Sequence, residues 1–328
     1  MPARSGDPSR RRRHESRTDS GERELADPLE KARRWYAEEL RFTASVHSRA
    51  VIQAFSTVPR EPSVGPGPWR IKSPFWRIAP GEQYWTTEDA DPRHVYHDVL
   101  IALDEACGIN NGQPSLWAGL FDELGITAGE RALHLGCGTG YYTAIAAELV
   151  GPNGRVTGIE IDPGLAERAR AVLTRWPQVS VVNADGSSAS LDPADVIITS
   201  AGATHPLPGW LDALNPGGRL LMPMTAGNQW GGMLLVTRQA ADAYAARFLR
   251  PAGFIEFSGT RDPKIGRRLA AAFGRDRGVP VQSLRRAPDE PDDTCWVAGD
   301  GWWLSTASIG AFKPSSRAYP RTRASEGK

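Results

Sequence analysis

The chain has 328 residues, of which 40% are hydrophobic, and this predicts one large α/β domain with appended segments, or two domains. A formal net charge of +1 argues against nucleic-acid binding by phosphate neutralisation, and no apolar run approaches the roughly 20 residues that cross a membrane. Three cysteines without a C-x-x-C pair predict neither a disulfide framework nor a metal site, so a cytoplasmic protein is expected.

The N-terminal part changes character near residue 30. Residues 1–30 carry almost no apolar side chains, so they are predicted to form a disordered tail. Over residues 28–55 apolar side chains recur with helical spacing. Residues 62–92 are rich in Pro, Gly and Trp and predict an irregular packed segment, whereas residues 99–106 fit either a helix or a strand. We therefore predict a helical and irregular segment over residues 31–115.

A glycine-rich turn lies at the centre of the chain. The short apolar run of residues 131–135 predicts a buried strand, and Gly136, Gly138 and Gly140 follow it at once. Residues 141–150 then have the apolar spacing of a helix. Glycines allow a ligand to approach the backbone closely, and the start of a helix offers unpaired N–H groups. This layout predicts a nucleoside-binding crevice at the carboxyl ends of parallel strands.

The strand predicted over residues 156–161 completes this unit. Glu160, near its end, lies twenty residues beyond Gly140, where a carboxylate can accept hydrogen bonds from ribose hydroxyls. Asp162 is predicted to cap the following helix rather than to bind a ligand. The glycine spacing is G-x-G-x-G, and Tyr141 stands where a dinucleotide fingerprint would carry its third spaced glycine.

Strands alternate with helices through the rest of the central region. The predicted strands are residues 179–182, 195–200, 219–223, 232–236 and 254–257, and the predicted helices are residues 116–124 and 211–214. Residues 215–218 predict a turn between the second helix and the strand at 219–223. Asp185 follows the first of these strands and either binds an adenine amino group or makes an Asp-Gly turn. The alternation predicts an α/β fold with a doubly wound, mostly parallel sheet, which we place at residues 116–261.

The C-terminal part, residues 262–312, reads as an extension of the domain. It contains a predicted amphipathic helix at residues 264–273 and a Pro- and Arg-rich linker at residues 275–293. Residues 294–305 predict a hairpin around an Asp-Gly turn. The tryptophans of this hairpin either form a docking surface or pack onto the main sheet. Residues 313–328 are predicted to be a second disordered tail.

Four stretches of the chain resemble protein-L-isoaspartate O-methyltransferases. They are AVIQAFSTVPRE at 50–61, NGQP at 111–114, LHLGCGTGYYTA at 133–144 and ADVIITSAGATHPLPGWLDALNPGGRLLMPM at 194–224. The glycine motif alone occurs in many methyltransferases, whereas the first and last stretches are much more specific. The resemblance covers residues 45–260.

The resemblance implies a Rossmann-like fold that binds S-adenosylmethionine (SAM) and transfers its methyl group to a carboxylate of an isoaspartyl or aspartyl residue. It implies that the three glycines of the central turn line the methionine part of SAM, that Glu160 holds the ribose and that Asp185 lies on the adenine side. The remaining positions that it implies for cofactor binding are His134, Cys137, Tyr141, Ile161, Gly186 and Ser200.

The resemblance also places the acceptor beside the loop of residues 111–114, called the acceptor loop below, with Gly112, Gln113 and Pro114 at the site. Two positions depart from the family pattern. Gly112 stands where the family has a serine at the reacting carboxylate. His134 stands where the first strand usually carries an acidic residue that helps to place the SAM amino group.

These departures leave the acceptor open between a peptide or protein carboxylate and other acceptors. A phenol or hydroxyl acceptor would need a general base, and His205 follows the fourth strand of the sheet at a suitable place. The alternatives are therefore a small-molecule O- or N-methyltransferase that uses His205, or a SAM-binding partner protein without catalysis. A peptide or protein substrate is expected, with no nucleic acid, membrane or metal partner.

Overall fold

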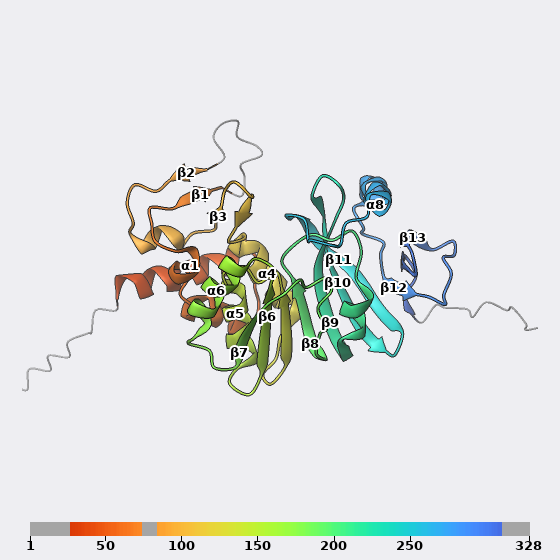
Figure 1. The fold of residues 1–328 in the computed structure, drawn as a ribbon, viewed down its shortest axis with the longest axis horizontal. Coiled ribbons are helices and arrows are strands. Elements are labelled where there is room, and N and C mark those ends of the chain that lie inside the picture. Colours follow the sequence, from red (N-terminus) through yellow and green to blue (C-terminus); the bar gives the residue numbers. More distant parts are fainter. Residues whose placement is uncertain (1–26, 74–83, 310–328) are drawn as a thin grey trace, which may run out of the picture.

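The computed structural model describes residues 27–73 and 84–309 (Figure 1). Most of the predicted N-terminal tail, residues 1–26, lies outside the described residues, and so does the predicted C-terminal tail. Residues 74–83, within the predicted irregular segment, lie outside them as well. A helix already begins at Pro28, where the side chain of Asp27 accepts a hydrogen bond from the backbone N–H of Leu29 at 3.1 Å.

The N-terminal part combines short helices with a small antiparallel sheet. Its helices are α1 (Pro28–Thr43), α2 (Arg49–Thr57), α3 (Glu61–Val64) and the 3-10 turn η1 (Pro92–Val95). Its strands are β1 (Arg70–Lys72), β2 (Trp85–Thr86), β3 (Leu100–Asp104) and β4 (Ile109–Asn110), in the order β2-β1-β3-β4. Residues 99–106 thus contain a strand rather than a helix, and the predicted irregular segment contains two short strands.

A second, ten-stranded sheet forms the centre of the molecule. Its strands are β5 (Arg131–Leu135), β6 (Arg155–Glu160), β7 (Val179–Asn183), β8 (Ala194–Thr199), β9 (Leu214–Thr225), β10 (Trp230–Ala240), β11 (Ala243–Gly253), β12 (Ser283–Arg286), β13 (Cys295–Gly299) and β14 (Trp302–Ser305). They follow the order β13-β14-β12-β11-β10-β9-β8-β5-β6-β7. The run β7-β6-β5-β8-β9 is parallel, and every later pairing is antiparallel. The predicted doubly wound α/β fold is confirmed, but the sheet as a whole is mixed rather than mostly parallel, because the strands after β9 pair antiparallel.

Helices cover both faces of this sheet. They are α4 (Pro114–Leu124), α5 (Tyr141–Val150), α6 (Pro163–Leu173), α7 (Pro208–Asp212) and α8 (Pro263–Asp276). Along β8, Val196 and Ile198 belong to the apolar core under α4 and α5, whereas Ile197 belongs to the core under α7 and α8. This alternation is expected of a strand that is buried on both faces. Helices α4 and α7 begin earlier than predicted, at Pro114 and Pro208, because proline is favourable in the first turn of a helix.

The later part of the sheet corrects three predictions. Residues 254–257 do not form a strand, because β11 ends at Gly253 and only Glu256 makes an isolated bridge, to Gly202. Residues 275–293 are not simply a linker, because β12 lies within them and pairs with β11. The turn predicted just before residue 219 lies inside β9, as an irregularity in its pairing with β8 where Gly217 adopts φ +79°.

The predicted hairpin at residues 294–305 is confirmed as β13 and β14, and β14 continues the main sheet by pairing with β12. Its tryptophans, Trp296, Trp302 and Trp303, are all buried. These side chains therefore pack within the fold instead of forming an exposed docking surface.

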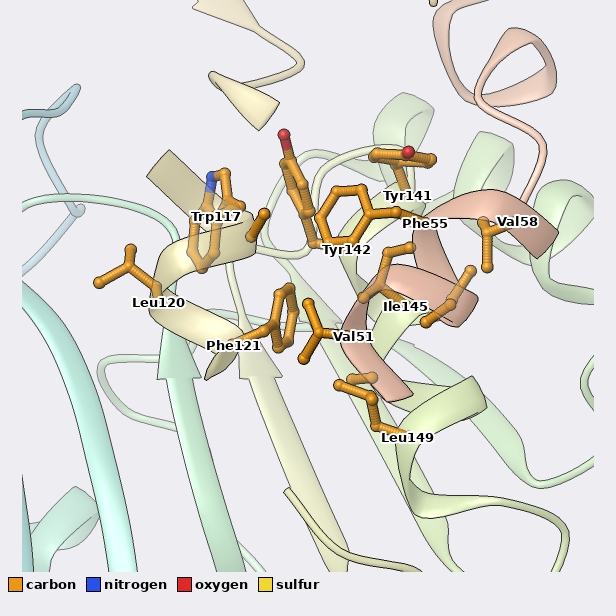
Figure 2. Packing of buried hydrophobic residues seen from close by; sticks show 14 of the residues in the cluster. Val51, Phe55, Val58, Trp117, Leu120, Phe121, Tyr141, Tyr142, Ile145 and Leu149 are labelled. Carbon is orange, nitrogen blue, oxygen red and sulfur yellow. The ribbon is translucent and has the colours of Figure 1, made fainter. Parts of the chain in front are cut away.

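An aromatic cluster joins the N-terminal helices to the central domain (Figure 2). Phe55 of α2 lies with its ring centroid 6.5 Å from that of Phe121 in α4 and 6.2 Å from that of Tyr141 in α5. Trp117 of α4 stacks on Tyr142 of α5 at 4.8 Å between centroids. Because these rings are buried, the start of α5, which follows the glycine turn, is held firmly against α2 and α4.

Candidate active site

The glycine turn and Glu160 meet at the carboxyl edge of the parallel strands. The Glu160 carboxylate is buried and accepts hydrogen bonds from the backbone N–H groups of Gly138 at 2.7 Å and Asp162 at 3.1 Å. Asp162 in turn caps α6, since its side chain accepts from the N–H of Leu165 at 2.8 Å. The structure thus brings the predicted ribose carboxylate and the glycine turn into direct contact, and it gives Asp162 the predicted role of a helix cap.

The glycines of the turn divide into two kinds. Gly136 and Gly138 have φ values of +72° and +56°, and a Cβ on either would meet no atom within 4 Å. A Cβ on Gly140 would lie 2.8 Å from the Leu173 side chain, so this glycine allows α5 to approach α6. The first two glycines therefore leave open space along the turn, which fits a ligand that lies against the backbone.

The residues predicted for the adenine side follow the ends of β6 and β7. Ile161 is 51% exposed at the end of β6, although it is a large apolar residue. Asp185 uses one carboxylate oxygen to accept from the N–H of Ser187 at 2.8 Å, as an Asp-Gly turn would. The carbonyl of Gly186 accepts from the indole N–H of Trp210 at 2.9 Å. An exposed apolar side chain and a partly free carboxylate at neighbouring strand ends fit a heterocycle with an amino group.

His134 is buried behind the glycine turn. Its Nδ1 lies 2.8 Å from Thr143 Oγ1 in α5, and its Nε2 lies 2.6 Å from Ser200 Oγ just past β8. Burial lowers the pKa of His134 from 6.5 to about 4, so the imidazole is neutral at physiological pH. The backbone N–H of Ser200 also donates to the carbonyl of Leu135 at 2.9 Å, which fixes Ser200 beside the turn.

Two predicted cofactor residues turn their side chains into the core. The Cys137 thiol is buried, and burial, followed by the nearby Glu160 charge, raises its pKa to about 12. The Tyr141 hydroxyl lies 3.3 Å from the hydroxyl of Tyr36 in α1, and burial raises the Tyr141 pKa. At these two positions it is the main chain, not the side chain, that belongs to the turn.

Trp117 of α4 and Tyr142 of α5 pack against the acceptor loop at Gly112. Gly112 adopts φ +70°, and a Cβ there would lie 2.8 Å from the indole nitrogen of Trp117 and 3.1 Å from the Tyr142 ring. The Tyr142 hydroxyl donates to the Gly112 carbonyl at 3.2 Å. Glycine at this position is therefore required by its neighbours in this chain, and the space for the family's serine side chain is filled.

A carboxylate that the sequence did not single out organises the rest of this loop. Asp98 accepts from the backbone N–H of Ser115 at 2.8 Å, so it caps the first turn of α4. The Gln113 amide nitrogen donates to Ser115 Oγ at 2.8 Å and lies 3.4 Å from the second Asp98 oxygen. Asp98 lies 17 residues before Ser115, so no local spacing signals this cap. Pro114 begins α4 and fixes the point where the loop ends.

Arg60, from the V-P-R-E stretch, holds the acceptor loop through hydrogen bonds to Asn111 and Gly112. Its guanidinium is fully buried and donates to the side-chain oxygen of Asn111 at 3.1 Å. The same group also donates to the backbone carbonyls of Val95, His97, Val99 and Gly112, at 2.8, 3.0, 2.9 and 3.5 Å. A buried cation that is satisfied almost entirely by carbonyl oxygens ties three segments of the chain together.

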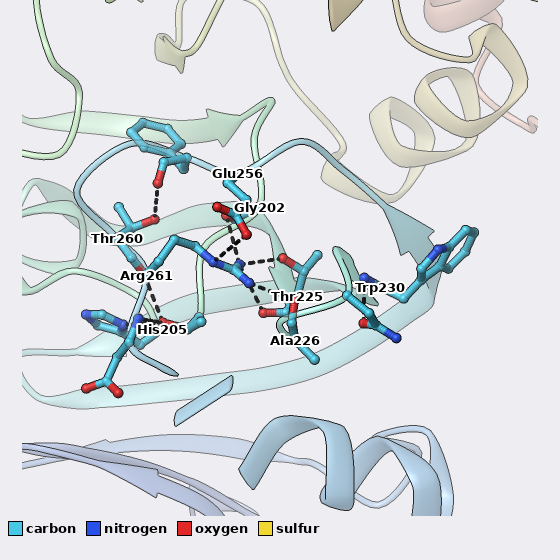
Figure 3. Close-up of polar contacts among 12 residues, drawn as sticks. Gly202, His205, Thr225, Ala226, Trp230, Glu256, Thr260 and Arg261 are labelled. Carbon is cyan, nitrogen blue, oxygen red and sulfur yellow. Dashed lines mark hydrogen bonds and ion pairs between the residues drawn. The ribbon is translucent and has the colours of Figure 1, made fainter. Parts of the chain in front are cut away.

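The loop after β8 is held by Arg261 (Figure 3). Arg261 donates to the carbonyls of Gly202, Thr225 and Ala226 at 3.2, 3.1 and 2.7 Å and pairs with Glu256 at 3.6 Å. These bonds join the ends of β8 and β9, next to the segment that carries His205. Local sequence patterns contain no signal for this anchor, because most of its partners are main-chain carbonyls of distant segments.

His205, the candidate base, is half-buried. Its Nδ1 lies 3.0 Å from the Thr204 hydroxyl, and its ring stacks on Trp302 with 6.2 Å between centroids. Burial lowers the pKa of His205, an effect that the Asp262 carboxylate opposes. The C-terminal hairpin thus contacts the loop that follows β8.

Comparisons with known proteins identify related sequences and structures with a similar fold. A family model described as "Protein-L-isoaspartate(D-aspartate) O-methyltransferase" matches residues 81–261. The protein-L-isoaspartate O-methyltransferase of Methanothrix thermoacetophila is 36% identical over 195 residues, which cover 58% of this chain and 80% of the relative. A solved protein-L-isoaspartate O-methyltransferase has a TM-score of 0.57 at 20% identity, covering 84% of this chain and 87% of that chain.

A second solved structure has a TM-score of 0.54 at 16% identity and covers 69% of this chain and 98% of that chain. It is a putative protein-L-isoaspartate O-methyltransferase from Plasmodium falciparum in complex with S-adenosyl-L-homocysteine. Within residues 27–73 and 84–309 no helix is long and apolar enough to cross a bilayer. In the same part of the chain, no three His, Cys, Asp or Glu side chains gather closely enough to hold a metal ion.

Proposed function

The chain belongs to the protein-L-isoaspartate(D-aspartate) O-methyltransferase family, and we propose that its acceptor is a carboxylate of an isoaspartyl or aspartyl residue in a peptide or protein. It is a SAM-dependent methyltransferase. The observation that carries the proposal is the placement of the acceptor loop directly against α5, the helix that follows the glycine turn, through the Tyr142–Gly112 hydrogen bond. Acceptor and cofactor would thus be held by one rigid unit.

We assign the cofactor to the crevice formed by the glycine turn, Glu160, Ile161 and Asp185. Gly136 and Gly138 leave open space for the methionyl part along the turn. Glu160 has lone pairs beyond those that accept the two backbone N–H groups, and these suit ribose hydroxyls. Ile161 offers an apolar surface for the adenine ring, and the free oxygen of Asp185 offers an acceptor for its amino group.

Catalysis of this reaction depends on the positioning of the two reactants more than on proton transfer. When bound, SAM supplies an electrophilic methyl group; its transfer to a carboxylate oxygen forms a methyl ester and leaves a neutral thioether. A carboxylate is already deprotonated at neutral pH, so the protein needs no general base for this acceptor. The rigid acceptor loop, held by Arg60 and Tyr142, then contributes by orienting the two reactants and by excluding water.

Methyl transfer from radiolabelled SAM to an isoaspartyl peptide, compared with its aspartyl twin, tests the acceptor. Base-labile label on either peptide supports a peptide carboxylate, and the ratio between the two shows which linkage is preferred. Label on neither peptide, with SAM bound, rejects this acceptor. That result would favour a small-molecule acceptor with His205 as the base, whose lowered pKa keeps the ring neutral.

Calorimetry tests the cofactor assignment separately. We expect Glu160→Ala to weaken SAM binding by about 1–3 kcal/mol, because the ribose hydroxyls lose their acceptor and the turn loses its contact to Gly138. Glu167→Ala is the matched control, since Glu167 is an exposed residue of α6 that forms a surface ion pair with Arg170. Unchanged affinity in the Glu160 variant would remove this residue from the site.

We also propose that the protein works in the cytoplasm and modifies proteins or peptides there. The three cysteines, Cys107, Cys137 and Cys295, are all free thiols, which suits a reducing compartment. Measuring methyltransferase activity in separated cell fractions would test this location, and activity confined to a fraction other than the cytoplasm would reject it.

A further inference from the structure

Helix α8 carries a row of cations along its exposed face. Its buried side chains, Ile265, Leu269 and Ala272, belong to the core on the opposite side of the helix. Exposed positions at spacings of i, i+3, i+4, i+7 and i+11 share one face of a helix. In α8 they are Lys264, Arg267, Arg268, Ala271 and Arg275. The four cations, called the basic stripe below, extend over about 16 Å at 1.5 Å per residue.

The basic stripe is not neutralised by acidic neighbours. On the other long surface helices, arginines pair with glutamates three or four residues away, as Arg34 does with Glu30 on α1 and Arg170 with Glu167 on α6. The positions three and four residues from each cation of the stripe hold no Asp or Glu. No ion pair involves the stripe within residues 27–73 and 84–309. Like charges at this spacing repel one another, and a bound anionic partner would remove that repulsion.

Two of the four cations are already held in place by the C-terminal hairpin. Arg268 donates to the Ala298 carbonyl at 2.9 Å, and Arg275 donates to the Trp296 carbonyl at 3.3 Å. A guanidinium group has five N–H donors, so most of them remain available to a ligand. The geometry of these donors matches a carboxylate, and a side chain that is already held loses less entropy on binding.

The chemistry of the chain favours a peptide with carboxylates over a nucleic acid as the partner. A nucleic acid binds through many phosphate contacts, whereas the whole chain has a formal net charge of only +1. The proposed substrate is already a peptide or protein. Acidic side chains elsewhere in that peptide can therefore neutralise the stripe.

The basic stripe begins at the edge of the central sheet that carries the proposed site. The N–H of Asp262, which caps α8, donates to the hydroxyl of Thr204 at 3.0 Å, in the loop that follows β8. Strand β8 pairs in parallel with β5, whose carboxyl end leads into the glycine turn. Figure 1 shows α8 at the upper edge of the molecule, where the small N-terminal sheet also lies.

A peptide of moderate length can reach from the acceptor loop to α8. Helix α8 contacts β10, which is three strands from β5 in the sheet. Three strand spacings amount to about 15 Å. An extended peptide covers this span with about five residues.

We propose that the basic stripe of α8 binds an acidic segment of the peptide substrate, about five or more residues away from the acceptor residue. This inference rests on the proposed peptide acceptor and names the chemistry of its flanking sequence. The stripe lies outside the cofactor crevice and the acceptor loop, so it contributes to substrate affinity and not to methyl transfer itself.

Fluorescence anisotropy with a labelled peptide that lacks an acceptor tests the surface alone. The probe contains several glutamates and no Asp or isoaspartyl residue, and its twin has glutamine at each of those positions. Lys264→Gln combined with Arg267→Gln should weaken binding of the Glu probe about fivefold, the effect of losing two exposed ion pairs, and should not change binding of the twin. Both side chains are exposed and make no hydrogen bond or ion pair with residues 27–73 or 84–309, so the variant should fold normally.

Arg34→Gln combined with Arg41→Gln is the matched control, because it removes the same charge from the surface of α1. Equal losses in the two double variants would overturn the proposal, since they would mean attraction by net charge. Equal binding of the Glu probe and its twin by the wild type would also overturn it. Binding of duplex DNA through the stripe, without binding of the Glu probe, would assign the stripe to phosphates instead of peptide carboxylates.

Methyl transfer separates this inference from the proposed function. The substrates are isoaspartyl and aspartyl peptides with the Glu segment, or its Gln twin, about six residues before or after the acceptor. Lys264→Gln with Arg267→Gln should raise KM about fivefold for the Glu-containing peptides and leave kcat within about twofold. The same change in KM for the Gln twins would overturn the inference. Methylation of no peptide by the wild type, with the Glu probe still bound through α8, would reject the proposed acceptor and leave the binding surface established.

Discussion

Gly112→Ser restores the residue type that the related enzymes carry in the acceptor loop, yet the structure predicts that it destabilises this chain. Gly112 has φ +70°, where a residue with a Cβ costs roughly 1–2 kcal/mol. The new Cβ would also lie 2.8 Å from the Trp117 indole nitrogen and 3.1 Å from Tyr142, and such overpacking costs about 1–3 kcal/mol. The sum is a loss of roughly 2–5 kcal/mol of unfolding free energy.

Gly108→Ser separates the two contributions. Gly108 has the same φ of +70°, but a Cβ there would meet nothing within 4 Å. This control should therefore show the backbone cost alone, and the difference between the two variants should be the overpacking. Urea unfolding followed by tryptophan fluorescence measures both.

A Gly112→Ser variant that is no less stable than Gly108→Ser would refute the argument that Trp117 and Tyr142 fill this space. Isoaspartyl methylation should also fail to rise in Gly112→Ser, because the loop must shift to admit the side chain. A strong rise in that activity with unchanged stability would show that the loop accepts the serine as the related enzymes do.

Three further substitutions test the supports of the site. Arg60→Ala should lower the unfolding free energy by about 3–5 kcal/mol in urea titrations, because it removes a buried cation and leaves its carbonyl partners without a donor. Arg60→Lys should restore less than half of this loss, since an ammonium group lacks the planar set of donors of a guanidinium. The pKa of His134 is about 4 in the folded protein and near 6.5 in the unfolded chain, so the free energy of unfolding should fall by roughly 2–3 kcal/mol as the pH drops from 7 to 4.5. His134→Gln should lack this part of the pH dependence of stability. An identical pH profile for the variant and the wild type would contradict this prediction. Asp162→Ala should cost about 1 kcal/mol of stability and leave SAM affinity within twofold by calorimetry, as a helix cap would; a large loss of affinity would make it a ligand.

Local patterns were sufficient for the centre of the fold. The strand of residues 131–135 and the helix of residues 141–150 have the bounds that their apolar spacing predicts, because both are buried and follow one another without a long connection. The cap by Asp162 and the hairpin at residues 294–305 were predicted from single residues with strong local preferences.

Prediction failed where pairing with distant strands decides the structure. Residues 254–257 have strand-like composition, yet β11 ends before them, because β10 offers pairing partners only as far as Trp230. Residues 283–286 lie in a segment with linker composition, yet they form a strand because β11 and β14 provide a partner on each side. Strand formation at such positions depends on neighbours that a local reading does not contain.

The sequence by itself determined the fold class, the glycine turn, the carboxylate of Glu160 beside it and the family. The glycine turn and the position of Glu160 follow from spacing within one continuous unit of about 30 residues, since parallel strands bring their carboxyl ends to one edge. The fold class follows from the alternation of strands and helices, and the family from the more specific stretches at 50–61 and 194–224. Only the tertiary structure decided that Gly112 must stay glycine, that Asp98 caps α4 and that His134 is a neutral link between Ser200 and Thr143. The physical reason is that most of these contacts join residues far apart in the chain, and that burial, which sets the charge of His134, exists only after the chain has folded.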